Sequence, residues 1–553
     1  MKKILSILFA ALLLCGTGLS AQAQKVQKTL PFSKGINMPV WLESSRLNVL
    51  LYGKKDFENI KSMGVQAVRL PVWFEIWNEG APEHKVSQEC FEMLDKAIEW
   101  TGELGMFLIL DFHNDCNGSS KTNPKIEQVL LKVWPQIAQR YKGKASHVVY
   151  EIMNEPHFAT GNISGDIKKW GKIQGNVLKA IRAVDPSRLV VVGGGDWNSL
   201  ASMLALPDYA DENLIYNFHD YTPFLFTHQG APWTDLKKVT GIPFPYSKEK
   251  MPKLPNGASE SARNYYKNYQ KDSVKENLCA PLDKAVEFAN KRNCALMCNE
   301  FGVSMVYADP AERANWYRLK CAWMDERNIC RTSWDYIQEF GVFKSTSETR
   351  FPEDLNKEVV EAMGFKVPAG KGESWYSQAR KSGDWTIYKN GSAGLARVNA
   401  WSVDGSLASK EDDGQKCVLF KSLLPHGSLV FSFGEASDLG GLAAAGARLE
   451  FMIKSRDKAL DLSVYFRDAQ SKTFPWRAAK NIKAAEFKAD GEWHKVSVPL
   501  QKMADIGGWS TKENAWKNSE GKFDWALVDA LVFENGNSAS ANGFALKDIK
   551  LAP

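Results

Sequence analysis

Short, almost continuously apolar runs alternate with longer amphipathic stretches along the first two thirds of the chain. Eight runs lie between residues 31 and 368: Gly35–Pro39, Gln66–Pro71, Met106–His113, Val148–Pro156, Leu189–Gly193, Leu214–Tyr221, Ala295–Phe301 and Cys330–Tyr336. Such runs are typical of parallel strands covered on both faces. Stretches between them, such as Gln88–Leu104 and Ile126–Tyr141, carry apolar residues at three- and four-residue spacing, which predicts helices. This part is therefore expected to consist of βα units.

Eight βα units in about 340 residues favour a (β/α)8 TIM barrel of the α/β class. An open doubly wound sheet is the alternative, and it would place a glycine-rich phosphate loop after its first strand. The run Gly35–Pro39 is followed by no such loop, and Gly193-Gly194-Gly195 after the fifth run predicts a tight turn. We therefore expect residues 31–368 to form a barrel.

Beyond about residue 370 the pattern changes to short β-type runs separated by glycine-rich turns. Examples are Leu462–Phe466, Trp493–Leu500, Ala526–Phe533 and Gly543–Leu551. This style predicts an all-β jelly-roll sandwich over residues 375–553. The boundary is expected between Val367 and Trp375, where proline and glycine cluster.

Residues 1–23 have the pattern of a secretory signal peptide. Lys2 and Lys3 precede the apolar run Ile4–Leu14, and Ala21-Gln22-Ala23 is a small-x-small cleavage site. The apolar run is shorter than the ~20 residues that a membrane-spanning helix needs. A lipid anchor at Cys15 is disfavoured because Leu14 precedes it. We expect a secreted or periplasmic protein without a membrane span after signal removal.

Composition adds little beyond a globular class. Hydrophobic residues make up 44% and charged residues 24% of the chain, as in soluble proteins. The formal charge is +6, and removal of two lysines with the signal leaves +4 (6 − 2), dispersed along the chain. This argues against a nucleic-acid partner. Neither the oligomeric state nor the pairing of the remaining cysteines follows from the sequence; Cys294 and Cys298 are expected to be buried thiols.

Polar residues end most of the apolar runs, which is where a barrel places its catalytic groups. Two of them are carboxylates on runs far apart in sequence: Glu155 in Asn154-Glu155-Pro156, and Glu300 in Asn299-Glu300-Phe301. The fourth and seventh strands face each other across a barrel mouth. Glycoside hydrolysis requires two carboxyl groups that flank the scissile bond, one protonated and one ionised.

The arrangement resembles glycoside hydrolase family 5, and the resemblance covers Lys34 to Tyr336. Eight residues match the family's pattern in barrel order: Arg69, His113, Asn154, Glu155, His219, Tyr221, Glu300 and Trp334. The resemblance implies that Glu155 is the general acid/base and Glu300 the nucleophile of a retaining hydrolase. A desolvated site beside the charge of Glu300 would keep Glu155 protonated.

The other six matched residues are expected to bind or orient the substrate and the carboxylates. Arg69 and Tyr221 would donate to Glu300, and Asn154 would bind a sugar 2-hydroxyl. His113 and His219 would orient the carboxylates or the sugar, with a structural histidine as the alternative for each. Trp334 is expected to form a platform under the sugar at the cleavage point.

No cofactor is expected. His113, Asp115 and Cys116 lie close together in sequence, but they lack the spacing and the remote partners of a metal site, so a catalytic metal is disfavoured.

Other aromatic residues are candidates for sugar contact. In the barrel they are Trp41, Trp73, Trp77, Trp197 and Trp233; in the C-terminal region they are Trp401, Tyr465 and Trp476, with a core role as the alternative for all of them. The C-terminal region resembles the jelly-roll modules of polysaccharide hydrolases through Gly491–Leu500 and Gly543–Leu551. It is expected either to bind glycan or to act as a stabilising spacer. The insertion from Thr222 to about Asn264 is expected to shape a wall of the cleft.

These observations predict a secreted, retaining endo-β-1,4-glucanase that acts on cellulose or a mixed-linkage β-glucan. A β-mannanase or a xyloglucanase could use the same residues, because the family's substrate choice lies in cleft loops. A non-catalytic glycan-binding protein on a decayed barrel would be expected to lack one catalytic Glu, and this chain has both.

Overall fold

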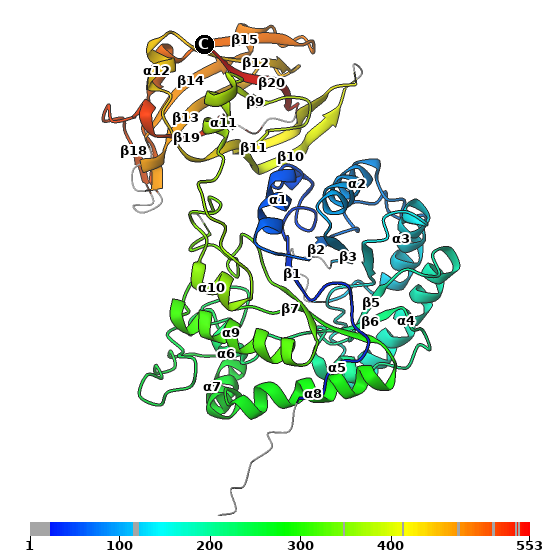
Figure 1. Cartoon of the computed structure of the whole chain (residues 1–553). Helices are drawn as coiled ribbons and strands as arrows, with labels where there is room; N and C mark the ends of the chain where they lie inside the picture. Colours follow the sequence, from blue (N-terminus) through cyan, green and yellow to red (C-terminus); the bar gives the residue numbers. More distant parts are fainter. Residues whose placement is uncertain are drawn as a thin grey trace, which may run out of the picture.

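The computed structural model describes residues 23–113, 121–346, 349–411, 414–472, 476–510, 515–536, 539 and 542–553. The predicted signal segment lies outside this part of the chain except for Ala23. The described residues form a parallel barrel followed by an antiparallel β domain (Figure 1). Both parts of the predicted fold class are therefore confirmed.

The barrel is a closed ring of eight parallel strands in sequential order. The strands are β1 (Lys34–Asn37), β2 (Ala67–Val72), β3 (Phe107–Phe112), β4 (Val148–Glu151), β5 (Val190–Gly193), β6 (Leu214–His219), β7 (Ala295–Glu300) and β8 (Cys330–Ser333). Each lies within one predicted run or extends it by one residue. Because β4 and β8 end early, Asn154, Glu155 and Trp334 lie in the loops that follow them.

Helices surround the barrel (Figure 1). They are η1 (Arg46–Asn48), α1 (Lys54–Ser62), α2 (Gln88–Glu103), α3 (Ile126–Tyr141), α4 (Ile163–Val184), α5 (Leu200–Leu204), α6 (Phe224–Thr227), α7 (Glu260–Asp272), α8 (Lys275–Lys291), α9 (Pro310–Glu326) and α10 (Lys357–Ala362). Side-chain caps fix several of their starts: Ser87 accepts from the backbone of Cys90 at α2, and Asp309 accepts from two amides at α9, where Pro310 is the first residue.

Two layers of side chains fill the barrel. The lower layer is apolar and comprises Phe32, Ala67, Ile109, Val149, Val191, Ile215, Ala295, Met297 and Cys330. Since side chains alternate along a strand, residues two positions further along face the same interior. On β2, β3, β4 and β6 these residues are polar and buried: Arg69, Asp111, Glu151 and Asn217. The lower part of the barrel interior is thus apolar, and a layer of charged and polar side chains lies directly beneath the mouth.

The C-terminal domain is a ten-stranded antiparallel sheet, with β17 and β18 forming a separate hairpin. Its elements are α11 (Trp375–Ser382), β9 (Thr386–Tyr388), β10 (Arg397–Lys410), β11 (Lys416–Ser437), α12 (Gly440–Ala444), β12 (Arg448–Lys454), β13 (Asp461–Asp468), η2 (Ala469–Lys472), β14 (Arg477–Lys483), α13 (Ala484–Phe487), β15 (His494–Pro499), η3 (Leu500–Lys502), β16 (Ala504–Asp505), β17 (Gly508–Ser510), β18 (Ala515–Lys517), η4 (Trp525–Leu527), β19 (Val528–Asn535) and β20 (Phe544–Ala552). Trp375 stacks on Phe433 of this domain at 4.1 Å between ring centroids. The domain boundaries that we expected, residues 31–368 and 375–553, stay a prediction.

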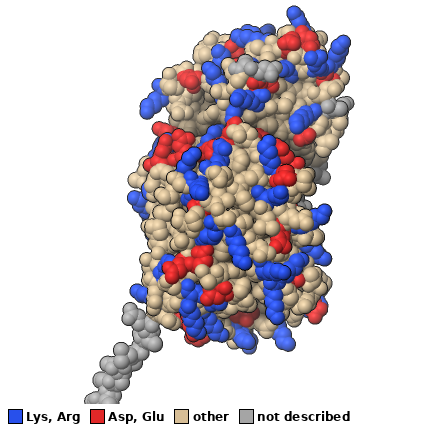
Figure 2. Space-filling view, turned by 90° about the vertical axis from the view of Figure 1, so that its right-hand side faces the viewer, with Lys and Arg blue, Asp and Glu red and all other residues tan. Residues whose placement is uncertain are grey.

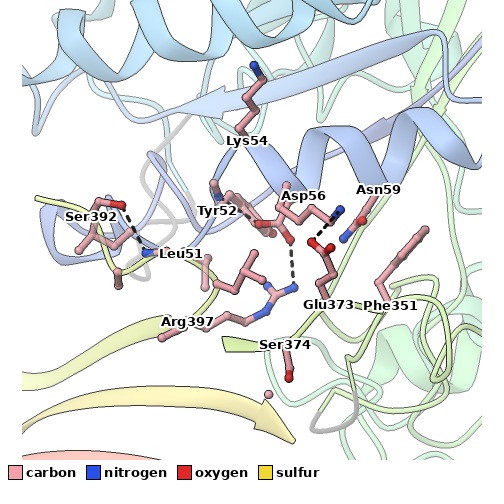
Figure 3. Close-up of a pocket in the computed structure, with 18 of the residues that line it drawn as sticks. Leu51, Tyr52, Lys54, Asp56, Asn59, Phe351, Glu373, Ser374, Ser392 and Arg397 are labelled. Carbon is pink, nitrogen blue, oxygen red and sulfur yellow. Dashed lines mark hydrogen bonds and ion pairs between the residues drawn. The ribbon is translucent and has the colours of Figure 1, made fainter. Parts of the chain in front are cut away.

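The β domain packs against α1 and α2 of the barrel (Figure 1). Arg397 on β10 forms a 3.0 Å ion pair with Asp56, and Ser406 donates to Glu89 at 2.9 Å. Between the domains lies a pocket of about 420 Å³, around which Figure 3 shows Arg397 beside Asp56. These contacts join the two domains through polar side chains.

The distribution of surface charge and the state of the cysteines agree with the expectations from the sequence. On the face shown in Figure 2, Lys and Arg are interspersed with Asp and Glu rather than gathered in one basic patch. Within the described residues, no helix combines the length and apolarity that crossing a bilayer requires. The seven cysteines of this part of the chain are free and buried, Cys294 and Cys298 among them, as expected.

Candidate active site

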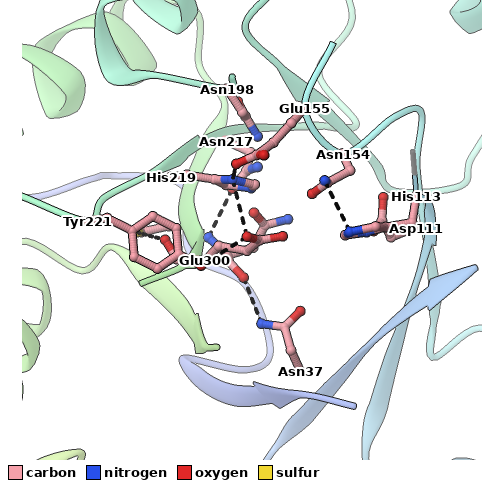
Figure 4. Close-up of polar contacts among 12 residues, drawn as sticks. Asn37, Asp111, His113, Asn154, Glu155, Asn198, Asn217, His219, Tyr221 and Glu300 are labelled. Carbon is pink, nitrogen blue, oxygen red and sulfur yellow. Dashed lines mark hydrogen bonds and ion pairs between the residues drawn. The ribbon is translucent and has the colours of Figure 1, made fainter. Parts of the chain in front are cut away.

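Most of the predicted site residues gather at the mouth of the barrel, while Arg69 belongs to the charged layer beneath them. Figure 4 shows His113, Asn154, Glu155, His219, Tyr221 and Glu300. An oxygen of Glu155 and an oxygen of Glu300 lie within 4.8 Å of each other, with His219 between them. The Nδ1 atom of His219 is 2.6 Å from Glu155 Oε1 and 3.5 Å from Glu300 Oε2. Two carboxyl groups from opposite sides of the ring are thereby brought to a single cleft.

A β-bulge turns Glu300 into the mouth. Along β6 and β7, Phe218 pairs with Cys298 but His219 pairs with Glu300, so Asn299 is an extra residue on β7. Asn299 is held by its side-chain amide, which donates to Glu151 at 2.7 Å, and by its backbone N–H, which donates to Asn217 at 3.0 Å. The bulge pairs Glu300 with His219; without the extra residue, Asn299 would occupy that position.

Two donors hold the Glu300 carboxylate. Arg69 Nη1 donates to Oε1 at 2.7 Å, and the Tyr221 hydroxyl donates to Oε2 at 3.1 Å. Burial beside this carboxylate raises the pKa of Tyr221 well above its usual value, which keeps the phenol protonated as a donor. These two hydrogen bonds hold and orient the Glu300 carboxyl group at the mouth.

Glu155 has a raised pKa. Its carboxyl group is desolvated at the mouth, and this burial raises its pKa from 4.5 to about 7, with the charge of Asp111 adding to the effect. His113 and Arg69 act in the other direction. A raised pKa is what a general acid working near neutral pH requires, and Glu155 has one.

His219 is neutral near pH 7, because burial lowers its pKa to about 4. Its Nε2 atom is buried and has no hydrogen-bond partner in the described part of the chain. We therefore assign the ring proton to Nδ1, where it is directed toward Glu155 and Glu300. His219 orients both carboxyl groups without bringing a positive charge.

Arg69 is the hub of the charged layer. It forms a bidentate pair with Glu151, at 2.7 and 2.8 Å, and it lies 3.0 Å from Asp111. Its Nη2 atom also donates to the Asn154 side chain at 2.8 Å. One guanidinium group thus fixes carboxylates or amides from β1, β3, β4, the loop after β4, and β7.

His113 and Trp334 line the other side of the mouth. The Nδ1 atom of His113 is 2.5 Å from Asp111, and its Nε2 atom is 3.2 Å from the Asn154 amide nitrogen. The Trp334 ring stacks near the His113 ring at 5.8 Å with an interplanar angle of 13°. All eight predicted site residues therefore lie in one connected cluster.

Several buried polar residues of this cluster were not among the predicted site residues. They are Asn37, Glu43, Asp111, Glu151, Asn217 and Asn299. Glu43, in the loop after β1, has a carboxyl oxygen with no hydrogen-bond partner in the described residues, and burial raises its pKa. The two-residue period of the strands could have indicated Glu151 and Asn217, whereas Glu43 follows no regular pattern.

The aromatic candidates divide by exposure. Trp41 and Trp77 are fully buried, and their indole N–H groups donate to backbone carbonyls, so they belong to the core and the sugar-contact expectation for them is wrong. Trp197 and Trp233 are 44% and 59% exposed. Trp197 also stacks on His157 at 4.2 Å, two residues beyond Glu155.

The insertion after β6 packs against the site, since His228 contacts the Tyr221 ring at 4.9 Å. In the β domain, Tyr465 and Trp476 are buried, so these two cannot present a sugar-binding face.

The described residues include one group of side chains close enough together to hold a metal ion. Within the described residues, the His, Cys, Asp and Glu side chains close enough to share an ion are Glu155, His219 and Glu300. These are the candidate acid, its histidine and the candidate nucleophile, so an ion there would occupy the place of the scissile bond. Asp115 and Cys116, which we weighed with His113, lie outside the described residues.

Comparisons with known proteins agree with this geometry. Residues 27–339 match the model of the cellulase family, glycosyl hydrolase family 5, and residues 410–553 match that of carbohydrate binding domain 30. Endoglucanase 3 of Fibrobacter succinogenes is 28% identical over 343 residues, which cover 58% of this chain and 52% of that protein. Endoglucanase C of Acetivibrio thermocellus is 28% identical over 328 residues, covering 55% of this chain and 91% of that protein.

This chain thus spans about half the length of the first relative and most of the second. Among solved structures, endoglucanase Cel5A from Thermotoga maritima is 24% identical with a TM-score of 0.48, covering 60% of this chain and 96% of its own.

Proposed function

The chain belongs to glycosyl hydrolase family 5 and is a glycoside hydrolase, and we propose that it is a retaining endo-β-1,4-glucanase with Glu155 as general acid/base and Glu300 as nucleophile. The observation that carries this proposal is the short separation of the two carboxyl groups, whose nearest ligand oxygens lie within 4.8 Å. Retaining enzymes hold these groups ~5–5.5 Å apart, whereas inverting enzymes leave room for a water at ~6.5–9.5 Å.

In the first step the Glu300 carboxylate attacks the anomeric carbon while the bond to the leaving oxygen breaks. Glu155, protonated because its pKa is raised to about 7, transfers its proton to that oxygen. In the second step the Glu155 carboxylate takes a proton from water, whose oxygen attacks the anomeric carbon and releases Glu300. The net reaction is hydrolysis with two inversions, and hence retention.

The neighbouring residues stabilise charge during these steps. Arg69 and Tyr221 donate to the Glu300 carboxyl group and orient it before attack. Asn154 is fixed by Arg69 at its Oδ1 and lies 3.2 Å from His113 Nε2 through its amide nitrogen, whose second N–H can bind the sugar 2-hydroxyl as the transition state forms. Because the site is preorganised, little rearrangement is needed on substrate binding.

Exposed aromatic rings support a polysaccharide substrate. Trp197 lies beside His157 on the Glu155 side of the cleft, which is the side of the leaving group that Glu155 protonates. Trp334 is half-buried beside the His113 ring, where it can form the platform under the sugar at the cleavage point. An exposed ring beyond that point suits a substrate chain that continues past it, as in endo cleavage of cellulose or mixed-linkage β-glucan. A β-mannanase or a xyloglucanase is the second candidate, since the same eight residues would serve either.

For the β domain we propose glycan binding through the β17–β18 hairpin. Trp509 and Trp516 form a cross-strand pair and are 52% and 50% exposed, and Arg477 lies 4.9 Å from the Trp516 ring. Flat exposed aromatic surfaces are what sugar rings require. The match to carbohydrate binding domain 30 over residues 410–553 supports the same role. Secretion, implied by residues 1–23, belongs to this proposal as well.

The function is tested with a panel of carboxymethylcellulose, lichenan, xyloglucan and glucomannan, followed by product size analysis. We expect the highest kcat/KM on an unsubstituted β-glucan with mixed oligosaccharide lengths early in the reaction. Glu300→Ala should lower kcat at least about a thousandfold, since the covalent route is lost. Near-parental turnover of this variant would contradict the assignment, and the highest kcat/KM on glucomannan or xyloglucan would favour the second candidate.

A further inference from the structure

The segment His219–Thr222 carries two of the site residues on one side and an unassigned ion pair on the other. Side chains alternate along a strand, so His219 and Tyr221 point to the mouth while Asp220 points outward, toward α9. Asp220 is 8% exposed, although it is a carboxylate at the edge of an active site. Its partner is Lys320 on α9, a lysine with no exposed surface.

Three contacts from α9 hold this segment. Lys320 Nζ lies 2.7 Å from Asp220 Oδ2 and donates to the Thr222 hydroxyl at 2.9 Å. One turn earlier on the helix, the Trp316 indole N–H donates to the Thr222 carbonyl at 3.0 Å. On the strand side, Asp220 Oδ1 accepts from both the backbone N–H and the hydroxyl of Thr222. The segment is therefore fixed from its outer face by one ammonium group and one indole.

The same segment is fastened to the candidate nucleophile. The Asp220 N–H donates to the Glu300 carbonyl at 2.9 Å, and the flanking His219 and Tyr221 both contact the Glu300 carboxylate. A shift of Asp220 by a fraction of an ångström would move both of these side chains. A buried charge pair is weak evidence for stability, but it is well suited to specify one arrangement.

We propose that Lys320 is a positioning residue for the hydrolysis: by holding Asp220 and Thr222 against α9, it fixes His219 and Tyr221 on the two carboxyl groups at the mouth. The inference rests on the proposed function, in which Glu155 and Glu300 perform the chemistry. The side-chain contacts of Lys320 are with Asp220 and Thr222 rather than with the carboxyl groups of Glu155 and Glu300. Its effect reaches the reaction through the segment that it holds.

Charge as well as position would change if Lys320 were removed. Titratable and charged groups face the segment and Glu300 from every element packed around them. They are Glu43 after β1, Arg69 on β2, Asp111 on β3, His113 after β3, Glu151 on β4, Glu155 after β4, His228 after α6, Cys298 on β7, Tyr317 and Cys321 on α9, and Tyr221 and His219 from the segment itself. In Lys320→Met the Asp220 charge is left without its partner. A buried negative charge favours the protonated form of neighbouring carboxyl groups.

The proposal is tested by measuring kcat, KM and the pH profile of kcat/KM for two variants, well below their melting temperatures. The first is Lys320→Met, and the second is the charge-neutral double variant Asp220→Asn/Lys320→Met. For Lys320→Met we expect kcat at least about tenfold lower, a smaller change in KM, and a pH profile displaced to higher pH. The double variant should regain the parental pH profile but keep the lower kcat, because the ammonium that grips Thr222 is still absent. If the single variant does not fold, the kcat of the double variant decides.

Arg327→Met is the matched control. Arg327 is a buried cation just beyond the C-terminal end of α9, and its side-chain contacts among the described residues are with Asp283, at 2.7 Å, Glu326 and the Trp323 carbonyl rather than with the segment. We expect it to lower the melting temperature while leaving kcat and the pH profile unchanged. Three results would overturn the proposal. The first is a parental kcat and pH profile in Lys320→Met, and the second is a parental kcat in the double variant. The third is a loss of kcat in Arg327→Met that equals the loss in Lys320→Met.

Failure of the proposed function is distinguishable from these outcomes. It would appear as turnover by Glu300→Ala, whatever Lys320 does.

Discussion

Replacing Glu155 by Gln should make the protein more stable at neutral pH and leave its stability unchanged in acid. Burial raises the pKa of Glu155 from 4.5 to about 7, so the folded state binds a proton more tightly than the unfolded chain does. The stabilising contribution of the carboxyl group is therefore fully present below about pH 4.5 and is lost as the pH rises through about 7. Gln does not titrate and has no such dependence.

The size of the effect follows from the pKa difference. About 2.5 units at 1.36 kcal/mol per unit is about 3 kcal/mol. The Glu155 side chain is 22% exposed, and water at the mouth reduces the cost of its charge. We therefore expect the free energy of unfolding of Glu155→Gln relative to the parent to rise by about 1–3 kcal/mol between pH 4 and pH 8.5.

Urea unfolding followed by tryptophan fluorescence at pH 4, 5.5, 7 and 8.5 measures this difference. Glu212→Gln, at an exposed position before β6, is the control and should show no such trend. A difference between parent and Glu155→Gln that is constant over this pH range would refute the reasoning. So would a difference that falls as the pH rises, because the sign follows from the raised pKa alone.

Three further outcomes follow from the same structure. The kcat/KM of the parent should fall above about pH 7, where Glu155 has lost its proton, and a constant value up to pH 9 would argue against it as the acid. Arg397→Ala should lower the free energy of unfolding by about 1–2 kcal/mol in urea, because it removes the ion pair with Asp56 between the domains; an unchanged midpoint would contradict a joined interface. Trp509→Ala and Trp516→Ala should each weaken binding of the full chain to insoluble cellulose at least about fivefold in pull-down assays, with parental binding as the contrary result.

Much of the barrel could be predicted because its strands are apolar and its site residues end them. The alternation along β4 even places Val149 in the apolar layer and Glu151 in the charged layer above it. The pattern of polar residues at the ends of the apolar runs indicates Asn154 and Glu155, but not Glu151, which lies before the end of its run. The period of two, applied inward from the ends, would have found it.

Other features are set by tertiary packing and leave little trace in the sequence. The extra residue Asn299 in β7 becomes visible only when β6 is paired with β7. Trp41 and Trp197 are the same residue type, yet Trp41 is enclosed by Tyr52, Phe57 and other rings while Trp197 projects at the mouth. Lys320, in a helical sequence, would be expected on a solvated face, and only the position of Asp220 explains its burial.

The central claim is that Glu300 attacks the sugar and forms a covalent intermediate. The most direct measurement is mass spectrometry of peptides from enzyme incubated with a 2-deoxy-2-fluoro-β-cellobioside that carries an activated leaving group, which slows release of the intermediate. We predict one cellobiosyl adduct, located on the peptide that contains Glu300 and absent in Glu300→Ala. An adduct on Glu155, or no adduct together with an α-anomer as the first product of a natural substrate, would contradict the mechanism.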